Sequence, residues 1–531
     1  MSEGAATVER AVERLRPLHH AASLSWWDAN VSATEENERR RVEADLALSD
    51  AMADPELFRE VGEARDNGAD DRTARQLELL HASLLPNQVP AELRHRIVEL
   101  EAKVESTFAQ HRGTVAGQPV DDNEIKRILR LSDDETERRE AWEASKTIGA
   151  AVADDVRELA RLRNEAARAL GYRDWFALSL ATSEMNEERL IATLEECDRL
   201  TADAFARWKE ATDARLAERF GVPASELRPW HYEDPFFQEV PAAGGVDLTE
   251  VFAGRDVVAL ARDTYAGMGI ETGPILDRSD LFARDGKSQH AFCIDVDRGG
   301  DVRVLANVEP DRYWADTMLH ELGHGSYDIG FGESLPWLLR DCHLTMTEGI
   351  AILMGRLAQE ADWLREVAGM DAEEAELLDG PLRGALAVEL LVFTRWVLVM
   401  TNFERAFYAD PDVDLSETWW SLVRQYQLVT PPEGRSEDDW AAKIHVACAP
   451  VYYHTYLYGH LVACQLRATL DRIAGGLVGR PEAGAFLVEH VFRPGESIRW
   501  DALLERATGE PLTAAHAARF IERGLAAEPD A

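Results

Sequence analysis

Residues 314–324 read WADTMLHELGH, and their apolar positions recur at the three- and four-residue spacing of an amphipathic helix. Asp311 precedes the stretch and can cap the first turn of that helix. Residues four apart lie on the same face of a helix, so His320 and His324 point the same way. The stretch therefore predicts a helix that presents two imidazoles side by side.

These histidines belong to an H-E-x-x-H pattern, which is the spacing of two zinc ligands on one helix. Glu321 follows His320 and can take a proton from a water molecule at the site. We expect the third ligand to be Glu348, on a second helix beginning near Asp341, because a carboxylate followed by apolar residues needs a partner. Two histidines and one glutamate leave one position of a tetrahedral zinc ion open, which is typical of a catalytic site holding a single ion.

Helical patterns extend outward from this stretch over most of the chain. The sequence from Val8 to about Leu200 is rich in Ala, Leu, Glu and Arg and contains few glycines or prolines. Helices are expected at 38–53, 72–84, 92–111, 154–170 and 248–268. One β signal stands out, because 290–297 (HAFCIDVD) and 301–308 (DVRVLANV) flank a glycine-containing turn and predict a hairpin. We therefore predict an all-α protein with one small β-hairpin at the metal site.

The chain is not expected to divide into independent domains. Prolines cluster between residues 223 and 241, but no linker is long enough to separate independent domains. We expect a single unit over residues 1–531, with an N-terminal helical lobe at about 1–240 and a lobe at 241–531 that carries the zinc site.

The charge of the chain limits its partners. Asp plus Glu number 97 against 57 Lys plus Arg, which gives a formal charge of −40. Nucleic acids and anionic membranes bind clustered cations, so we expect neither as a partner. The simplest interpretation of the acidity is a well-solvated surface, and adaptation to a salty cytoplasm is the alternative.

Other features favour a cytoplasmic location. The five cysteines are odd in number and scattered, which is typical of thiols in a reducing compartment. The first residues, MSEGAATVERAVERL, lack the pattern of a secretory signal. The most apolar segment, 385–400, is interrupted by Glu389 and Arg395 and is expected to be too short to cross a bilayer.

A second group of polar residues lies near the C-terminus. Lys443-Ile444-His445 is followed by PVYYHTYLYGH at 450–460, in which Tyr453 and Tyr456 share a helical face. Peptide hydrolysis at zinc places negative charge on the carbonyl oxygen, and a phenol or an imidazole N–H aimed at that oxygen stabilises the transition state. An aromatic core stripe is the alternative, but four tyrosines and three histidines within 16 residues are too polar for it.

Several further segments occur in the order found in a known family. They are RNE at 163–165, GYRDW at 171–175, HA at 290–291, DVR at 301–303, WWSL at 419–422, YQ at 426–427, PP at 431–432 and KIH at 443–445. Together with HELGH and Glu348, they make the chain resemble the angiotensin-converting enzyme and oligopeptidase group of zinc peptidases, including thimet-type and oligoendopeptidase F-type enzymes. The resemblance implies an all-α, two-lobed fold with a deep central channel that admits short peptides.

The resemblance also implies roles for individual residues. Tyr456 and His445 would stabilise the oxyanion. The substrate-binding residues would be His290 and Ala291, which hold the peptide backbone by β-augmentation, and Lys443 and Tyr453 on its C-terminal side, with Tyr452 as the alternative to Tyr453.

Two positions depart from the converting-enzyme pattern. Ile352 stands where that branch has an acidic residue supporting a zinc histidine, so another group must orient the imidazole. His454 and Thr455 stand where that branch has an arginine linked to chloride activation, so no chloride dependence is expected.

We therefore expect a zinc metallopeptidase acting on short peptides, either an oligoendopeptidase or a peptidyl-dipeptidase. A carboxypeptidase of the same clan is a third option. Lys443 hints at recognition of a free carboxylate, although a helix lysine is usually a solvated cation. A catalytically idle peptide-binding protein of the same fold and a non-peptidase zinc hydrolase remain alternatives. The oligomeric state, the physiological peptide and the preferred metal are left open.

Overall fold

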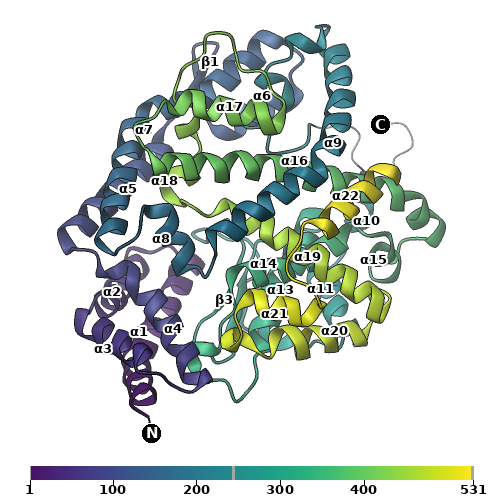
Figure 1. Ribbon diagram of the computed structural model, residues 1–531. Coiled ribbons are helices and arrows are strands. Elements are labelled where there is room, and N and C mark those ends of the chain that lie inside the picture. Colours follow the sequence, from purple (N-terminus) through teal and green to yellow (C-terminus); the bar gives the residue numbers. More distant parts are fainter. Residues whose placement is uncertain (1, 242–245, 528–531) are drawn as a thin grey trace. The chain divides into compact units, whose positions relative to one another are not determined.

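The computed structural model describes residues 2–241 and 246–527 (Figure 1). Helices dominate these residues, and their strands form two small antiparallel hairpins, so the all-α class is confirmed. Contacts divide the chain into two units. Unit 1 comprises Met1–Gln88, Val246–Leu382 and Tyr458–Ala517, and unit 2 comprises Val89–Gly245, Arg383–Leu457 and Ala518–Ala531. The lobes at 1–240 and 241–531 and the channel stay predictions.

Unit 1 begins with four helices that pack on one another (purple in Figure 1): α1 (Glu3–Val31), α2 (Glu35–Met52), α3 (Pro55–Asp66) and α4 (Asp71–Leu84). Each starts at a side chain that accepts a hydrogen bond from its first turn; these caps are Ser2, Thr34, Asp54 and Asp70. Val8, Leu15, Val61, Leu77 and Leu80 are among the residues of their shared core. The expected helices at 38–53 and 72–84 are thus confirmed within a few residues.

The predicted hairpin of unit 1 is confirmed with shorter strands. β3 (Phe292–Asp295) pairs antiparallel with β4 (Val302–Leu305), and Phe292 lies opposite Leu305. The turn contains Arg298 and Gly300, both with positive φ, of 50° and 104°. The hairpin packs against α13 (Arg312–Ile329), the helix that carries HELGH.

The single helix expected at 248–268 is wrong. The structure has α10 (Thr249–Phe252) and α11 (Val257–Gly267) instead. Gly254 separates them with a φ of 69°, which a continuing helix cannot contain. Asp256 then caps α11 by accepting from the N–H of Ala259. The other helices that lie wholly or partly in unit 1 are α12 (Gly273–Leu276), α14 (Leu344–Gly355), α15 (Ala361–Glu366), α16 (Ala372–Ala409), α19 (Tyr453–Ala474), α20 (Pro481–Leu487), α21 (Trp500–Thr508) and α22 (Ala515–Ala527).

Unit 2 is built around long helices. The expected helix at 92–111 is α5, and that at 154–170 is the second half of the 35-residue α7. The helices that lie wholly or partly in this unit are α5 (Ala91–Gln110), α6 (Asp122–Leu131), α7 (Glu135–Ala169), α8 (Trp175–Thr182), α9 (Glu187–Phe220), α16 (Ala372–Ala409), α17 (Leu415–Gln427), α18 (Ile444–Cys448) and parts of α19 and α22.

Unit 2 also contains a hairpin that sequence inspection missed. β1 (Gly113–Val115) and β2 (Gln118–Val120) pair antiparallel around Ala116 and Gly117. Both turn residues have positive φ, of 49° and 75°, as in the two-residue turns that match the twist of a hairpin. The Ala-Gly pair between valine-containing segments was the available signal.

Helix α16 is longer than the apolar segment expected at 385–400. By length and composition it could cross a membrane, but 83% of its most apolar window is buried inside the protein. Such burial is typical of the core helix of a globular protein.

Candidate metal centre

Helix α13 places the HELGH residues against α14. Asp311 caps α13 as predicted, since its carboxylate accepts from the N–H of Trp314 at 2.8 Å. Gly323 is needed for the close approach of the two helices, because a Cβ there would lie 2.9 Å from Cα of Ala351. α14 begins at Leu344, three residues later than expected, and carries Glu348 in its second turn. The two helices therefore bring their metal-ligating side chains to one point.

The three predicted ligands converge. Nε2 of His320 lies 3.3 Å from Nε2 of His324 and 4.0 Å from a carboxylate oxygen of Glu348, and one ligand atom from each residue lies within 4.8 Å of the others. Zinc with bonds of about 2.1 Å separates two tetrahedral ligands by about 3.4 Å, which matches the histidine pair. Burial lowers the pKa of His320 to about 4 and that of His324 to about 3, so both imidazoles are neutral and offer lone pairs. These residues fit a zinc ion.

Thr347 orients one of the ligands. Its Oγ1 lies 2.6 Å from Nδ1 of His324, and it is the residue before Glu348 in α14. When Nε2 of His324 binds a metal, Nδ1 carries the ring proton and donates it to the hydroxyl oxygen. Thr347 therefore supplies the support that Ile352 cannot give.

Glu321 is buried beside the ligands. Burial raises the pKa of its carboxyl to about 8, with a smaller contribution from Glu348, and the N–H of Cys293 in β3 acts in the opposite direction. A divalent cation at the site would favour the ionised carboxylate. A carboxyl with a raised pKa next to an open metal position is suited to accept and return a proton.

His290 and Ala291 lie immediately before β3 and are not part of it. Their side chains are exposed and half-buried, respectively. Among the described residues β3 pairs only with β4, so its other edge has no strand partner. Phe292 anchors this end of the strand by packing on Trp26 and Trp27, with ring centroids 4.3 and 6.0 Å apart.

The second group of predicted residues forms an aromatic cluster in unit 2. The ring of Tyr453 lies 4.8 Å from that of His445 and 5.7 Å from that of Tyr456, and Tyr452 lies 5.0 Å from Tyr456. Tyr453 is buried, whereas the other three are half-buried. Burial, with the charge of Lys443, lowers the pKa of His445 to about 4 and keeps its imidazole neutral. A neutral imidazole and two phenols can donate hydrogen bonds to one oxyanion.

Buried partners hold this cluster in place. The fully buried Arg163 donates to the hydroxyl of Tyr408 at 3.1 Å and to the carbonyl of Ala447, in the helix that carries His445. The carboxylate of Glu404 accepts from the N–H of Val451 at 2.7 Å. The RNE segment at 163–165 thus anchors the backbone on which the cluster is built.

Lys443 is not a solvated cation. Its Nζ donates to Oε1 of Gln238 at 2.8 Å and lies 5.4 to 5.5 Å from the ring centroids of Phe236, Trp396 and Tyr453. Burial lowers the pKa of its ammonium group to about 8. Within residues 2–241 and 246–527, the bond to Gln238 is the hydrogen bond that Lys443 donates, so two of its N–H donors can serve an anionic ligand.

Two models of known protein families match parts of this chain. The family model described as angiotensin-converting enzyme matches residues 2–198, and that described as peptidase family M3 matches residues 277–522. The second match contains the three metal ligands and the aromatic cluster, and both are families of gluzincins, zinc peptidases with two histidines and a glutamate.

Both matched segments of the chain are therefore similar to gluzincin zinc peptidases.

Curated gluzincins align along most of the chain. An angiotensin-converting enzyme of Mesocricetus auratus is 21% identical over 92% of this chain, and the chain covers 40% of that protein. An angiotensin-converting enzyme-related protein of Drosophila melanogaster is 22% identical over 94% of this chain and 86% of its own length. An angiotensin-converting enzyme of Theromyzon tessulatum is 22% identical over 73% of this chain and 68% of its own length. The chain thus spans less than half of the Mesocricetus relative.

Two supporting residues escaped sequence inspection. Thr347 adjoins a predicted ligand, and a hydroxyl residue beside Glu348 was the only local signal. Gln238 lies 205 residues before Lys443, in the proline-rich segment at 229–241, and nothing in that segment points to a lysine so far away.

Proposed function

We propose that the protein is a zinc metallopeptidase that hydrolyses short peptides in the cytoplasm. The convergence of His320, His324 and Glu348 around an open ligand position, with Glu321 beside it, carries the proposal. An idle scaffold of the same fold predicts the loss of a ligand or of the base, and all four residues are present. A non-peptidase hydrolase would need neither the unpaired edge of β3 nor the tyrosine cluster.

The chemistry assigns a task to each of these side chains. Zinc supplies Lewis acidity, which polarises the scissile carbonyl and makes a water molecule more acidic. Glu321 takes the proton of the attacking water and passes it to the leaving amine. Tyr456 and His445 donate hydrogen bonds to the oxygen that becomes negative as the carbonyl is attacked. His290 and Ala291 bind the peptide backbone through main-chain hydrogen bonds.

We further propose that the enzyme releases dipeptides from free C-termini. The ammonium of the half-buried Lys443, with Gln238 and Tyr453 around it, supports this mode over internal cleavage. A desolvated cation gains most from a carboxylate that it can pair with, and a peptide with an amidated end offers none. The environment of Lys443 is therefore that of a carboxylate-binding group.

The test is mass spectrometry of the products of one unstructured ten-residue peptide, with free and with amidated C-terminus. The proposal predicts loss of C-terminal dipeptides from the free form, no such loss from the amidated form, and abolition by a chelator with recovery on adding zinc. Internal cuts at the same positions in both peptides would refute dipeptide release and indicate an endopeptidase. Zinc-loaded protein that cleaves neither form would refute the peptidase proposal and favour the idle scaffold.

A further inference from the structure

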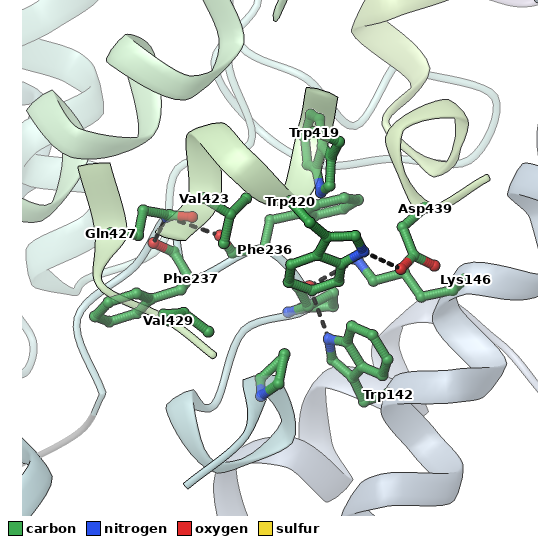
Figure 2. Close-up of a pocket in the computed structure, with 12 residues that line it drawn as sticks. Trp142, Lys146, Phe236, Phe237, Trp419, Trp420, Val423, Gln427, Val429 and Asp439 are labelled. Atoms are coloured by element: carbon green, nitrogen blue, oxygen red, sulfur yellow. Dashed lines mark hydrogen bonds between the residues drawn. The ribbon is translucent and has the colours of Figure 1, made fainter. Parts of the chain in front are cut away.

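A small aromatic cavity in unit 2 surrounds one buried lysine (Figure 2). The cavity measures about 20 Å³, which is room for roughly one water molecule and too little for an organic ligand. Its lining residues are Trp142, Lys146, Pro229, Pro235, Phe236, Phe237, Trp419, Trp420, Val423, Gln427, Val429 and Asp439. A role for this region must therefore come from the contacts that its polar side chains make.

Lys146 holds the segment 234–238 from helix α7. Its side chain is buried, and its Nζ donates to the carbonyl of Pro235 at 2.7 Å and lies 3.3 Å from the ring centroid of Phe236. Trp142, one turn earlier on α7, donates its indole N–H to the same carbonyl at 3.0 Å. One backbone oxygen thus receives two donors from one helix, and an ammonium group contacts the next side chain along the chain.

Further contacts hold the same segment from other directions. Nε2 of Gln427, on α17, donates to the carbonyls of Phe236 and Phe237 at 3.0 and 2.8 Å. The buried carboxylate of Asp234 accepts from the N–H groups of Phe236 and Gln238. Phe237 has a φ of 51°, which costs a non-glycine residue energy and persists only where neighbours impose it. The backbone of the segment is therefore fixed by its surroundings.

The same segment contacts Lys443, the proposed carboxylate-binding group. Gln238 accepts from Lys443, and the ring of Phe236 lies 3.3 Å from the ammonium of Lys146 and 5.4 Å from that of Lys443. A shift of Pro235 or Phe236 would change the contacts of Lys443 with Gln238 and Phe236. The cavity thus connects a buried lysine on α7 to the residues that surround Lys443.

The choice of lysine at position 146 is itself informative. Only six of the 57 basic residues of the chain are lysines, and three of them, Lys146, Lys209 and Lys287, are buried. Lys209 donates to both oxygens of Asp213 and to the hydroxyl of Tyr232, so its ammonium is fully paired. Among the described residues, Lys146 instead has a single hydrogen-bond acceptor, the carbonyl of Pro235. Its hydrogen bond and its shortest ring contact are both directed to segment 234–238.

We propose that Lys146 is a positioning residue for substrate selection: by holding Pro235 and Phe236, it keeps Gln238 and Phe236 against Lys443 and so sets the preference for peptides with a free C-terminal carboxylate. The inference rests on the proposed function, because it assigns Lys443 to the carboxylate of the peptide. It adds a determinant of specificity that contacts no substrate atom.

The test measures binding without turnover. Calorimetry in a Glu321→Gln background compares one short peptide with free and with amidated C-terminus. We expect the parent to bind the free form at least about tenfold more tightly, as a charge-assisted hydrogen bond provides. Adding Lys146→Met should bring that ratio within about twofold and leave the affinity for the amidated peptide within about twofold. Lys209→Met, a matched buried lysine, should lower the melting temperature and preserve the ratio.

A pH series separates positioning from general packing. Burial lowers the pKa of Lys146 to about 7, with Asp439 and Asp234 raising it and Arg435 and Lys443 lowering it. In the parent, the free-to-amidated affinity ratio should fall as the pH rises past about 7, when Lys146 loses its charge, and again near 8. The Lys146→Met variant, whose ratio is already within about twofold, should show no step near pH 7.

Two results would overturn the inference: a folded Lys146→Met variant that keeps the full ratio, or a Lys209→Met variant that loses it equally. If Lys146→Met does not fold, Trp142→Phe removes the other donor to Pro235, and an unchanged ratio in that variant also overturns it. Equal binding of both peptides by the parent would refute the carboxylate role of Lys443 and this inference together. Failure of the wild type to cleave any peptide would refute only the peptidase proposal, since the binding measurement does not use turnover.

Discussion

Oγ1 of Thr347 lies 2.6 Å from Nδ1 of His324. Thr347 directly precedes Glu348, the third predicted metal ligand. When Nε2 of His324 binds a metal, Nδ1 carries the ring proton and donates it to the hydroxyl oxygen of Thr347. Thr347→Val keeps the shape of the side chain and removes the oxygen, so zinc affinity should fall about 10- to 100-fold. Competition with a chromophoric chelator measures it. Thr347→Ser is the control and should stay near the wild type; equal affinity in the valine variant would contradict the role.

Glu321 should be required for turnover and dispensable for zinc. Glu321→Gln keeps the size of the side chain and removes its ability to accept a proton, so kcat should fall by at least about 10²- to 10⁴-fold. Metal analysis of the purified variant should still find one zinc per chain. A variant with full activity would refute the assignment of the base.

Glu404 should hold the backbone that leads into the tyrosine cluster. Val451 is β-branched and has a φ of 59°, and the buried carboxyl of Glu404 accepts its N–H. Glu404→Ala should reduce kcat about tenfold or more with zinc content unchanged, because the backbone beside His445 and Tyr453 loses this restraint. Glu404→Gln keeps an acceptor and should retain most of the activity.

The same residue predicts a change of stability with pH. Burial raises the pKa of Glu404 from 4.5 to about 8, so the folded state holds a proton that the unfolded chain releases above 4.5. Its contribution to stability is therefore present in full below pH 4.5 and is lost as the pH rises to about 8. Melting temperatures of the wild type and Glu404→Gln should diverge between pH 5 and 8, with the variant gaining. Parallel curves would contradict the raised pKa.

Lys443 should make substrate affinity depend on pH. Its lowered pKa of about 8 means that the ammonium is charged below that pH and neutral above it. KM for the peptide with a free C-terminus should rise about tenfold from pH 8 to pH 9.5, as the charged fraction falls, while KM for the amidated peptide stays level. Lys443→Met should flatten the first curve. If KM of the wild type varied with pH in the same way for both peptides, Lys443 would not be the group that binds the carboxylate.

The acidic surface should make stability depend on salt. With a formal charge of −40, the acidic side chains repel one another in the folded chain. Raising KCl from 0.1 to 1 M shortens the screening length from about 10 to about 3 Å and weakens this repulsion. The melting temperature should rise by about 5 °C or more over that range. Sucrose at matched osmolality provides a control without ionic screening. A melting temperature independent of KCl would favour a charge distribution already balanced by local ion pairs.

Local patterns predicted the parts of this protein that neighbouring residues encode. The helix at 312–329 and its cap at Asp311 follow from spacing and capping chemistry, and the pair His320 and His324 follows from the helical repeat. The β3–β4 hairpin follows from alternating residues around a glycine-containing turn. The break between α10 and α11 was missed because one glycine interrupts an otherwise helical pattern, and a single glycine does not always end a helix.

The sequence by itself determined the helical class, the metal-ligand spacing and the presence of a proton acceptor, because each depends on side chains within a few residues of one another. The tertiary structure alone decided which groups support them. Thr347 reaches His324 only because Gly323 lets two helices meet closely, and Gln238 reaches Lys443 across 205 residues only because α7 and α17 hold its segment in a strained conformation. Such contacts depend on packing between distant segments, and no local periodicity records which distant side chain will occupy the space.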